Sequence, residues 1–196
     1  MSTDNFVIQS DVLVEYTGDD ECVNVPYGAR KIGEWAFKGN SQLKKVLMHD
    51  GIEEIDRGAF FECASLESVH IPSNVNIISY SAFRGCKNLV SVEFWDGVDA
   101  SEKIIDECAF AECEKLESII LSVDVVTIRD DAFRGCTNLK YVCYLGDEED
   151  FAWIEIGDNN ECFRNATVYF YSNLKPSEKG NFWYYKDGKP QIWDVE

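Results

Sequence analysis

The stretch ISYSAFRGCKNLVSVEF, residues 78–94, holds the pattern that decides the fold of this chain. Near copies of it begin at Ile32, Ile55, Ile105 and Ile128. Each copy carries an Ala-Phe pair, followed in four of the five by a cysteine, and then by Leu-x-x-Val or Leu-x-x-Ile. The steps between successive phenylalanines are 23, 23, 27 and 23 residues. A repeat of this length predicts a solenoid, in which each unit buries its apolar face only by stacking on its neighbours.

Each unit divides into the same parts. Residues 66–71, LESVHI, end in alternating apolar and polar side chains, which is typical of a half-buried strand. Residues 72–74, PSN, predict a turn, and a second short extended segment follows with Val75 and Ile78 facing inward. Residues 81–86, SAFRGC, are expected to form one helical turn ended by glycine.

The register of the repeat also predicts the core. Equivalent positions in successive units are expected to stack into columns of buried side chains. The first column is Leu43, Leu66, Leu89, Leu116 and Leu139, and the second is Val46, Val69, Val92, Ile119 and Val142.

Four of the eight cysteines occupy one slot of the repeat, three residues after the phenylalanine: Cys63, Cys86, Cys113 and Cys136. Asn40 holds that slot in the first unit. A slot that accepts Cys or Asn predicts a small buried side chain that satisfies a carbonyl of the turn. Disulfides are the alternative, because stacked strands lie about 5 Å apart, within disulfide reach. The cysteine spacing follows the repeat and selects no pairs, which favours free thiols.

Charge and hydropathy exclude several classes of function. The formal net charge is -18, from 36 acidic and 18 basic residues, so the surface repels nucleic acid and anionic lipid. No apolar run approaches the roughly 18 residues of a membrane span. The first residues, MSTDNFVIQSDV, show no signal peptide. We expect a cytoplasmic chain as written, or a secreted or cell-surface one if an export signal has been trimmed.

The third unit carries four extra residues within Trp95–Glu102, which are expected to project as a loop from one edge.

Three segments are expected along the chain. The segments are an N-terminal cap with a degenerate half-repeat, residues 1–31; the solenoid, residues 32–172, with units starting near 32, 55, 78, 105 and 128 and a degenerate last unit; and an aromatic C-terminal tail or cap, residues 173–196.

The unit I-x-x-x-A-F-x-x-C-x-x-L-x-x-V-x-I-P-x-x-V resembles the BspA-like bacterial leucine-rich repeat family over about residues 12–172. The segment NATVYFYS, residues 165–172, is similar to the ends of such arrays. The resemblance implies a β-rich α/β solenoid, a right-handed leucine-rich repeat array of about five 23-residue coils with caps at both ends. It also implies a parallel strand per coil on the concave side, adhesion or protein binding at the cell surface, and no catalytic residues.

Function is expected on the outward-facing residues of the concave strands. Exposed aromatic and aliphatic side chains in a row are typical of interaction hot spots. We therefore predict a non-enzymatic module that binds a protein or peptide ligand there, unless the C-terminal tail covers part of this row. The candidate binding residues are Glu93, Trp95, Ile120, Tyr141, Leu145, Tyr169 and Tyr171.

A carbohydrate-binding adhesin is the alternative, with Trp95, Trp183 and Tyr185 as stacking platforms for sugar rings. No catalytic pattern and no Gly-rich phosphate loop is present, so no cofactor is expected. A metal site is not expected either. His49 and His70 lack further ligands, and the acidic run 147–150 lacks calcium-loop spacing and is expected to be a solvated loop.

Overall fold

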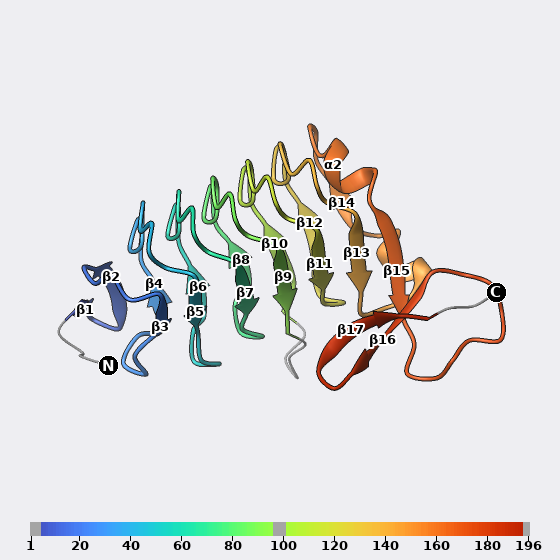
Figure 1. Ribbon diagram of the computed structural model, residues 1–196, viewed down its shortest axis with the longest axis horizontal. Helices are drawn as coiled ribbons and strands as arrows, with labels where there is room; N and C mark the ends of the chain where they lie inside the picture. Colours follow the sequence, from blue (N-terminus) through green and yellow to red (C-terminus); the bar gives the residue numbers. More distant parts are fainter. Residues whose placement is uncertain (1–4, 96–100, 194–196) are drawn as a thin grey trace.

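The computed structural model describes residues 5–95 and 101–193. Its dominant feature is a sheet of parallel strands, one per coil, which we call the long-strand sheet (Figure 1). Each of its strands pairs in parallel with the strand of the next coil. These strands are β3 (Cys22–Asn24), β5 (Lys45–Leu47), β7 (Ser68–Ile71), β9 (Ser91–Phe94), β11 (Ser118–Leu121), β13 (Tyr141–Tyr144) and β15 (Thr167–Tyr171).

A second sheet forms another side of the coils. Its short strands come from the second extended segment of each unit, and an antiparallel hairpin, β1 with β2, begins it. The strands are β1 (Phe6–Gln9), β2 (Val12–Tyr16), β4 (Lys31–Ile32), β6 (Glu54–Ile55), β8 (Ile77–Ile78), β10 (Lys103–Ile105), β12 (Val125–Ile128) and β14 (Glu155–Ile156).

The solenoid is confirmed, with two corrections. The described residues form about seven turns, not about five, because the degenerate segments at both ends pair as full coils through β3 and β15. Helix is scarce: the described residues contain only the four-residue helices α1 (Glu148–Phe151) and α2 (Glu161–Arg164). The predicted core columns are confirmed, since every leucine and valine or isoleucine in them is buried.

The Ala-Phe segments form tight turns, and the expected helical turn is wrong. In the third unit Ser81 and Gly85 flank Phe83 with φ angles of 56° and 75°. The same two slots have positive φ in all five units, which prevents a right-handed helical turn. Backbone hydrogen bonds within the turn alternate with bonds between coils: the Arg84 N–H donates to the Ser81 carbonyl at 3.2 Å, whereas the Phe83 N–H donates to the Ala109 carbonyl of the next coil at 2.8 Å.

The marker phenylalanines form one continuous stack through the centre of the solenoid. Phe60, Phe83 and Phe110 are fully buried, and their ring centroids lie 5.0 and 5.2 Å apart with nearly parallel planes. The column continues from Phe37 to Phe163. Each ring from Phe60 to Phe133 is thus covered on both faces by the equivalent rings of its neighbours, so none of these coils buries its phenylalanine alone.

The cysteines of the repeat behave as predicted. The Cys86 thiol donates to the carbonyl of Phe60, the marker phenylalanine of the preceding coil, at 3.2 Å. Cys63, Cys113 and Cys136 make the same contact in their own coils, each to the marker phenylalanine of the preceding coil. In the first unit the Asn40 amide donates instead to the Gly18 carbonyl at 3.1 Å. All eight cysteines are free.

The last coil ends the ladder with a side chain. The Phe133 N–H donates at 2.9 Å to the side-chain oxygen of Asn160, whereas the equivalent Phe110 N–H donates to the backbone carbonyl of Ala132. The same fully buried amide donates through Nδ2 to the Arg129 carbonyl at 2.8 Å. Asn160 therefore satisfies backbone groups that another coil would otherwise pair.

The insertion in the third unit returns to the solenoid at a buried lysine. Lys103 donates through Nζ to the Ser73 carbonyl at 2.6 Å and lies 3.1 Å from the Asp124 carboxylate. A buried ammonium is costly unless it is paired, and Lys103 has both partners. Because Ser73 and Asp124 lie in different coils, Lys103 also joins the turns of the two flanking coils. The expected projecting loop falls on residues 96–100, which lie outside the described residues.

The thiols give a direct test of this core. Burial raises the pKa of Cys63 and Cys136 to about 12 and raises the pKa of Cys86 and Cys113 as well. Near pH 8, where a free thiol of pKa about 8.5 is partly ionised, these four should stay protonated and inaccessible. We expect Ellman's reagent to react promptly with exposed Cys22 in the native protein and with close to eight thiols in denaturant. Fewer than seven in denaturant would indicate a disulfide and contradict this packing.

Candidate interaction surface

The outer face of the long-strand sheet carries two columns of side chains. The strand register aligns them across the coils, as the repeat predicted. The first column is Ser68, Ser91, Ser118, Tyr141 and Thr167, and the second is His70, Glu93, Ile120, Cys143 and Tyr169. Polar side chains therefore occupy the earlier coils, and larger apolar side chains occupy the later ones.

The C-terminal tail forms a hairpin that folds back over this face. Strand β16 (Phe182–Lys186) pairs with the end of β15 and then turns into β17 (Lys189–Ile192). Figure 1 shows the hairpin crossing the lower ends of the long strands, with its tip toward β9. Asp187 and Gly188 form the tip with φ angles of 53° and 71°, which an Asp-Gly hairpin turn requires.

Trp183 anchors the hairpin to the sheet. Its side chain is 0% exposed and packs on Ile120 and Cys143. Leu145 and Tyr169 border this cluster. The indole Nε1–H donates to the Tyr144 carbonyl at 2.9 Å. The hairpin therefore covers the apolar part of the outer face and satisfies its own polar atom in doing so.

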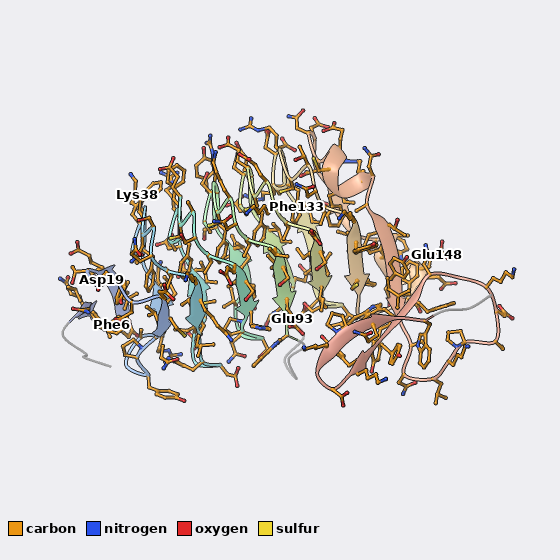
Figure 2. The ribbon with its side chains drawn as sticks, viewed as in Figure 1. Phe6, Asp19, Lys38, Glu93, Phe133 and Glu148 are labelled. Atoms are coloured by element: carbon orange, nitrogen blue, oxygen red, sulfur yellow. The ribbon has the colours of Figure 1, made fainter. Side chains whose placement is uncertain are left out.

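A polar contact fixes the hairpin at the boundary between the covered and open coils. The Tyr185 hydroxyl donates to Glu93 Oε1 at 2.7 Å, and His70 Nδ1 lies 2.8 Å from Glu93 Oε2. Figure 2 labels Glu93 where the hairpin approaches β9. Burial raises the pKa of Glu93, but the hydrogen bonds from His70 and Tyr185 outweigh burial and lower it overall. The carboxylate is thus held ionised as the acceptor of both groups.

The structure separates the candidate binding residues into two groups. Ile120 is 5% exposed beneath Trp183, so its expected exposure is wrong, and Leu145 and Tyr169 are half-buried at the edge of the same cluster. Trp95, Tyr141 and Tyr171 remain exposed. Sequence reasoning identified the outward slots but not the residues of the hairpin that cover them. The Asp-Gly pair at 187–188, with strand-like residues on both sides, was the signal that could have indicated a hairpin.

A pocket lies between the hairpin and the open side of the covered coils. Its volume is about 290 Å³. Tyr141 from β13 forms one wall, and Pro190 and Ile192 from β17 line it from the hairpin. The remaining lining residues are Ser118, Cys143, Trp183 and Gln191. Strand β13 and the hairpin therefore enclose a largely apolar pocket beside Tyr141, one of the candidate binding residues.

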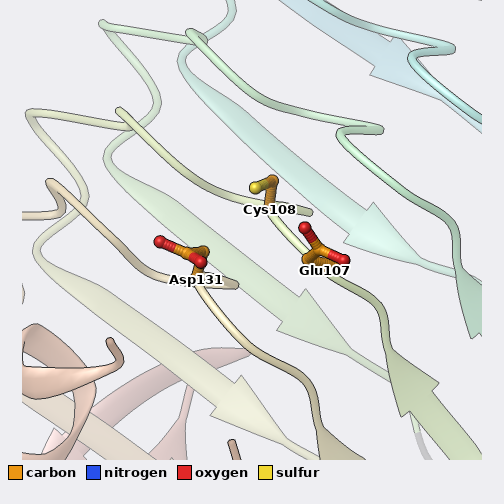
Figure 3. A group of neighbouring side chains, drawn as sticks. All are labelled: Glu107, Cys108 and Asp131. Atoms are coloured by element: carbon orange, nitrogen blue, oxygen red, sulfur yellow. The ribbon is translucent and has the colours of Figure 1, made fainter. Parts of the chain in front are cut away.

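Two other groups of potential metal ligands lie among the described residues and already have other contacts. Glu107, Cys108 and Asp131 place one donor atom each within 4.8 Å of one another (Figure 3). Asp131 is already paired with Arg134 at 3.2 Å, and burial raises the pKa of Cys108, which disfavours the thiolate that binds metal. Because Asp147 accepts the Asp150 N–H and caps α1, the acidic run 147–150 lies partly in a helix, not only in the expected loop.

The two histidines have separate partners. His49 Nε2 lies 3.2 Å from the Pro26 carbonyl, and its ring stacks on Tyr27. His70 contacts Glu93 instead. In the part of the chain that the structure describes, no helix has both the length and the apolar character needed to cross a membrane.

Comparison with known proteins assigns the family. The profile of the BspA type leucine rich repeat region matches six copies, over residues 15–140 and 98–185. The chain belongs to this family. No curated protein matches the sequence.

Several solved structures share the fold. A leucine rich cell surface protein from Faecalibacterium prausnitzii is 29% identical with a TM-score of 0.66, over 74% of this chain and 38% of that one. The Treponema pallidum leucine rich repeat protein is 23% identical with a TM-score of 0.60, over 80% and 85%. A leucine-rich repeat protein from Eubacterium ventriosum is 16% identical with a TM-score of 0.66, over 97% and 56%. The chain thus spans well under half of the first of these proteins.

Removing the Trp183 anchor should uncover the sheet beneath it. Burial raises the pKa of Cys143 to about 12, and Trp183 covers its thiol. In Trp183→Ala we expect Cys143 to react with a thiol reagent in the native protein at least about tenfold faster than in the wild type. Mass spectrometry of the labelled peptide identifies the residue. Trp153→Ala, which removes an exposed tryptophan elsewhere, is the matched control and should leave the rate unchanged. An unchanged rate in Trp183→Ala would contradict the docked hairpin.

Proposed function

We propose that this chain is a binding module that takes a protein or peptide ligand on the open part of the long-strand face. The observation that carries the proposal is the apolar pocket at Tyr141, bounded by the hairpin. An apolar side chain of the ligand enters this pocket, while Glu93 and Trp95 lie along the face toward the earlier coils.

Rigidity supports this proposal. Parallel pairing fixes the spacing of Tyr141 and its neighbours, and Tyr141 packs edge-on against Tyr169 with centroids 6.0 Å apart. A preorganised wall loses little side-chain entropy when a ligand binds. The family is generally non-catalytic, and we propose no reaction. The likeness to a cell surface protein supports a surface role in adhesion as part of the same proposal.

A carbohydrate ligand is the second candidate, because of a different concavity. Tyr27 and Trp95, both exposed, line a recess of about 680 Å³ together with Arg30, Asp50 and Glu53. Aromatic faces beside charged hydrogen-bonding groups suit a sugar ring. Trp183, the other tryptophan expected as a platform, is fully buried and is not part of this candidate.

Selection of random peptides displayed on phage tests the main proposal. We expect peptides enriched on the wild-type protein to carry an aromatic or large aliphatic residue. Their affinity should fall at least about tenfold on Tyr141→Ala, which removes the pocket wall, and hardly at all on Tyr27→Ala, which removes a more exposed tyrosine that does not line the pocket.

Peptides that bind Tyr141→Ala as tightly as the wild type would contradict the proposed site. Binding of the wild type to a glycan array, lost in Trp95→Ala, would favour the carbohydrate candidate instead.

A further inference from the structure

A second exposed apolar recess lies at the turns of the last two coils, outside the long-strand face. Trp153, which follows α1, is 84% exposed, and Val123 in the turn of the preceding coil is 50% exposed. They line a groove of about 350 Å³. The other lining residues are Val125, Val126, Tyr144, Asp150 and Ile154. We call this the Trp153 groove.

The groove is more than a single exposed ring. Its lining residues come from two coils, and the Tyr144 hydroxyl is held by the Val123 carbonyl at 3.4 Å. Ile154 and Val125 are buried, so they fix the floor while Trp153 stands at the rim. An aromatic rim over a fixed apolar floor is the arrangement that receives the anchor side chain of a partner.

The charge beside the groove is strongly negative and uncompensated. Asp150 lines the groove itself, and Glu148 and Glu149 precede it in α1, whose Glu148 is labelled in Figure 2. In the described parts of the chain no lysine or arginine forms an ion pair with any of these three carboxylates. Elsewhere on the coils, several cations form ion pairs with carboxylates of neighbouring coils. These pairs include Arg30–Glu53, Lys44–Glu21, Arg84–Glu112, Lys87–Glu114, Arg129–Asp106 and Lys140–Glu117.

We propose that the Trp153 groove binds a basic peptide segment that carries one large apolar side chain between lysines or arginines. The apolar side chain packs between Trp153 and Val123, and the flanking cations face Glu148, Glu149 and Asp150. A net charge of -18 attracts such a partner over distance, and the groove supplies the contact that retains it. This site is separate from the pocket at Tyr141 and does not depend on it.

Three labelled synthetic peptides test the assignment on the intact chain: KRKFKRK, KRKAKRK and EEEFEEE. We expect the first to bind at least about tenfold more tightly than the other two, because only it supplies both the anchor and the charge. Binding should weaken as the salt concentration rises, since the carboxylates are exposed.

Matched variants locate the site. Trp153→Ala should weaken KRKFKRK at least about tenfold, whereas Tyr27→Ala, which removes another highly exposed ring, should change it less than twofold. Glu148→Gln/Glu149→Gln/Asp150→Asn should weaken it several-fold. Glu15→Gln/Glu34→Gln/Glu67→Gln removes the same charge from exposed residues in other coils and should not.

Circular dichroism checks that each variant is folded. The proposal is overturned if the wild type does not bind KRKFKRK, or if the Trp153 and acidic variants behave as their controls do. It is also overturned if sedimentation shows a wild-type dimer that Trp153→Ala dissociates, because the groove would then be occupied by a second copy of this chain.

Discussion

The structure depends on one constraint: every coil needs the next coil to accept backbone hydrogen bonds from its turn and to cover its phenylalanine ring. The Phe83 N–H has no acceptor within its own turn and donates to Ala109, while its ring is covered by Phe60 and Phe110. Positive φ angles on both sides of the phenylalanine accompany this arrangement. Such conformations are costly for non-glycine residues such as Ser81, so the bonds and ring contacts between coils must compensate for them.

The same constraint explains the two ends and, through them, the functional surface. At the last coil Asn160 replaces the missing carbonyl, and the hairpin covers the apolar residues that the long-strand face presents there. Trp183 thus terminates the array and also leaves an apolar pocket beside Tyr141. The open and covered parts of the face meet at Glu93, which accepts from both His70 of the sheet and Tyr185 of the hairpin.

Much of the fold could be predicted from sequence because it is periodic. The leucine and valine columns, the outward slots and the role of the repeated cysteines all follow from one register. The turn conformation could not, because Ser81 takes a positive φ that residues other than glycine seldom adopt. The burial of Ile120 could not be predicted either, since the path of residues 173–192 has no counterpart in the repeat. Trp153 at the rim of the Trp153 groove also lies beyond the last regular unit, where periodicity carries no information.

The central claim is that continuity of the phenylalanine column holds the solenoid together. The free energy of unfolding of Phe83→Ala, from urea titration of the intact chain, tests it most directly. Phe83 is fully buried between two rings, so the account predicts a loss of about 3–5 kcal/mol relative to the wild type, with a smaller loss for Phe83→Leu. A loss below about 1 kcal/mol for Phe83→Ala would contradict it, because a core site of this kind cannot be emptied at so little cost.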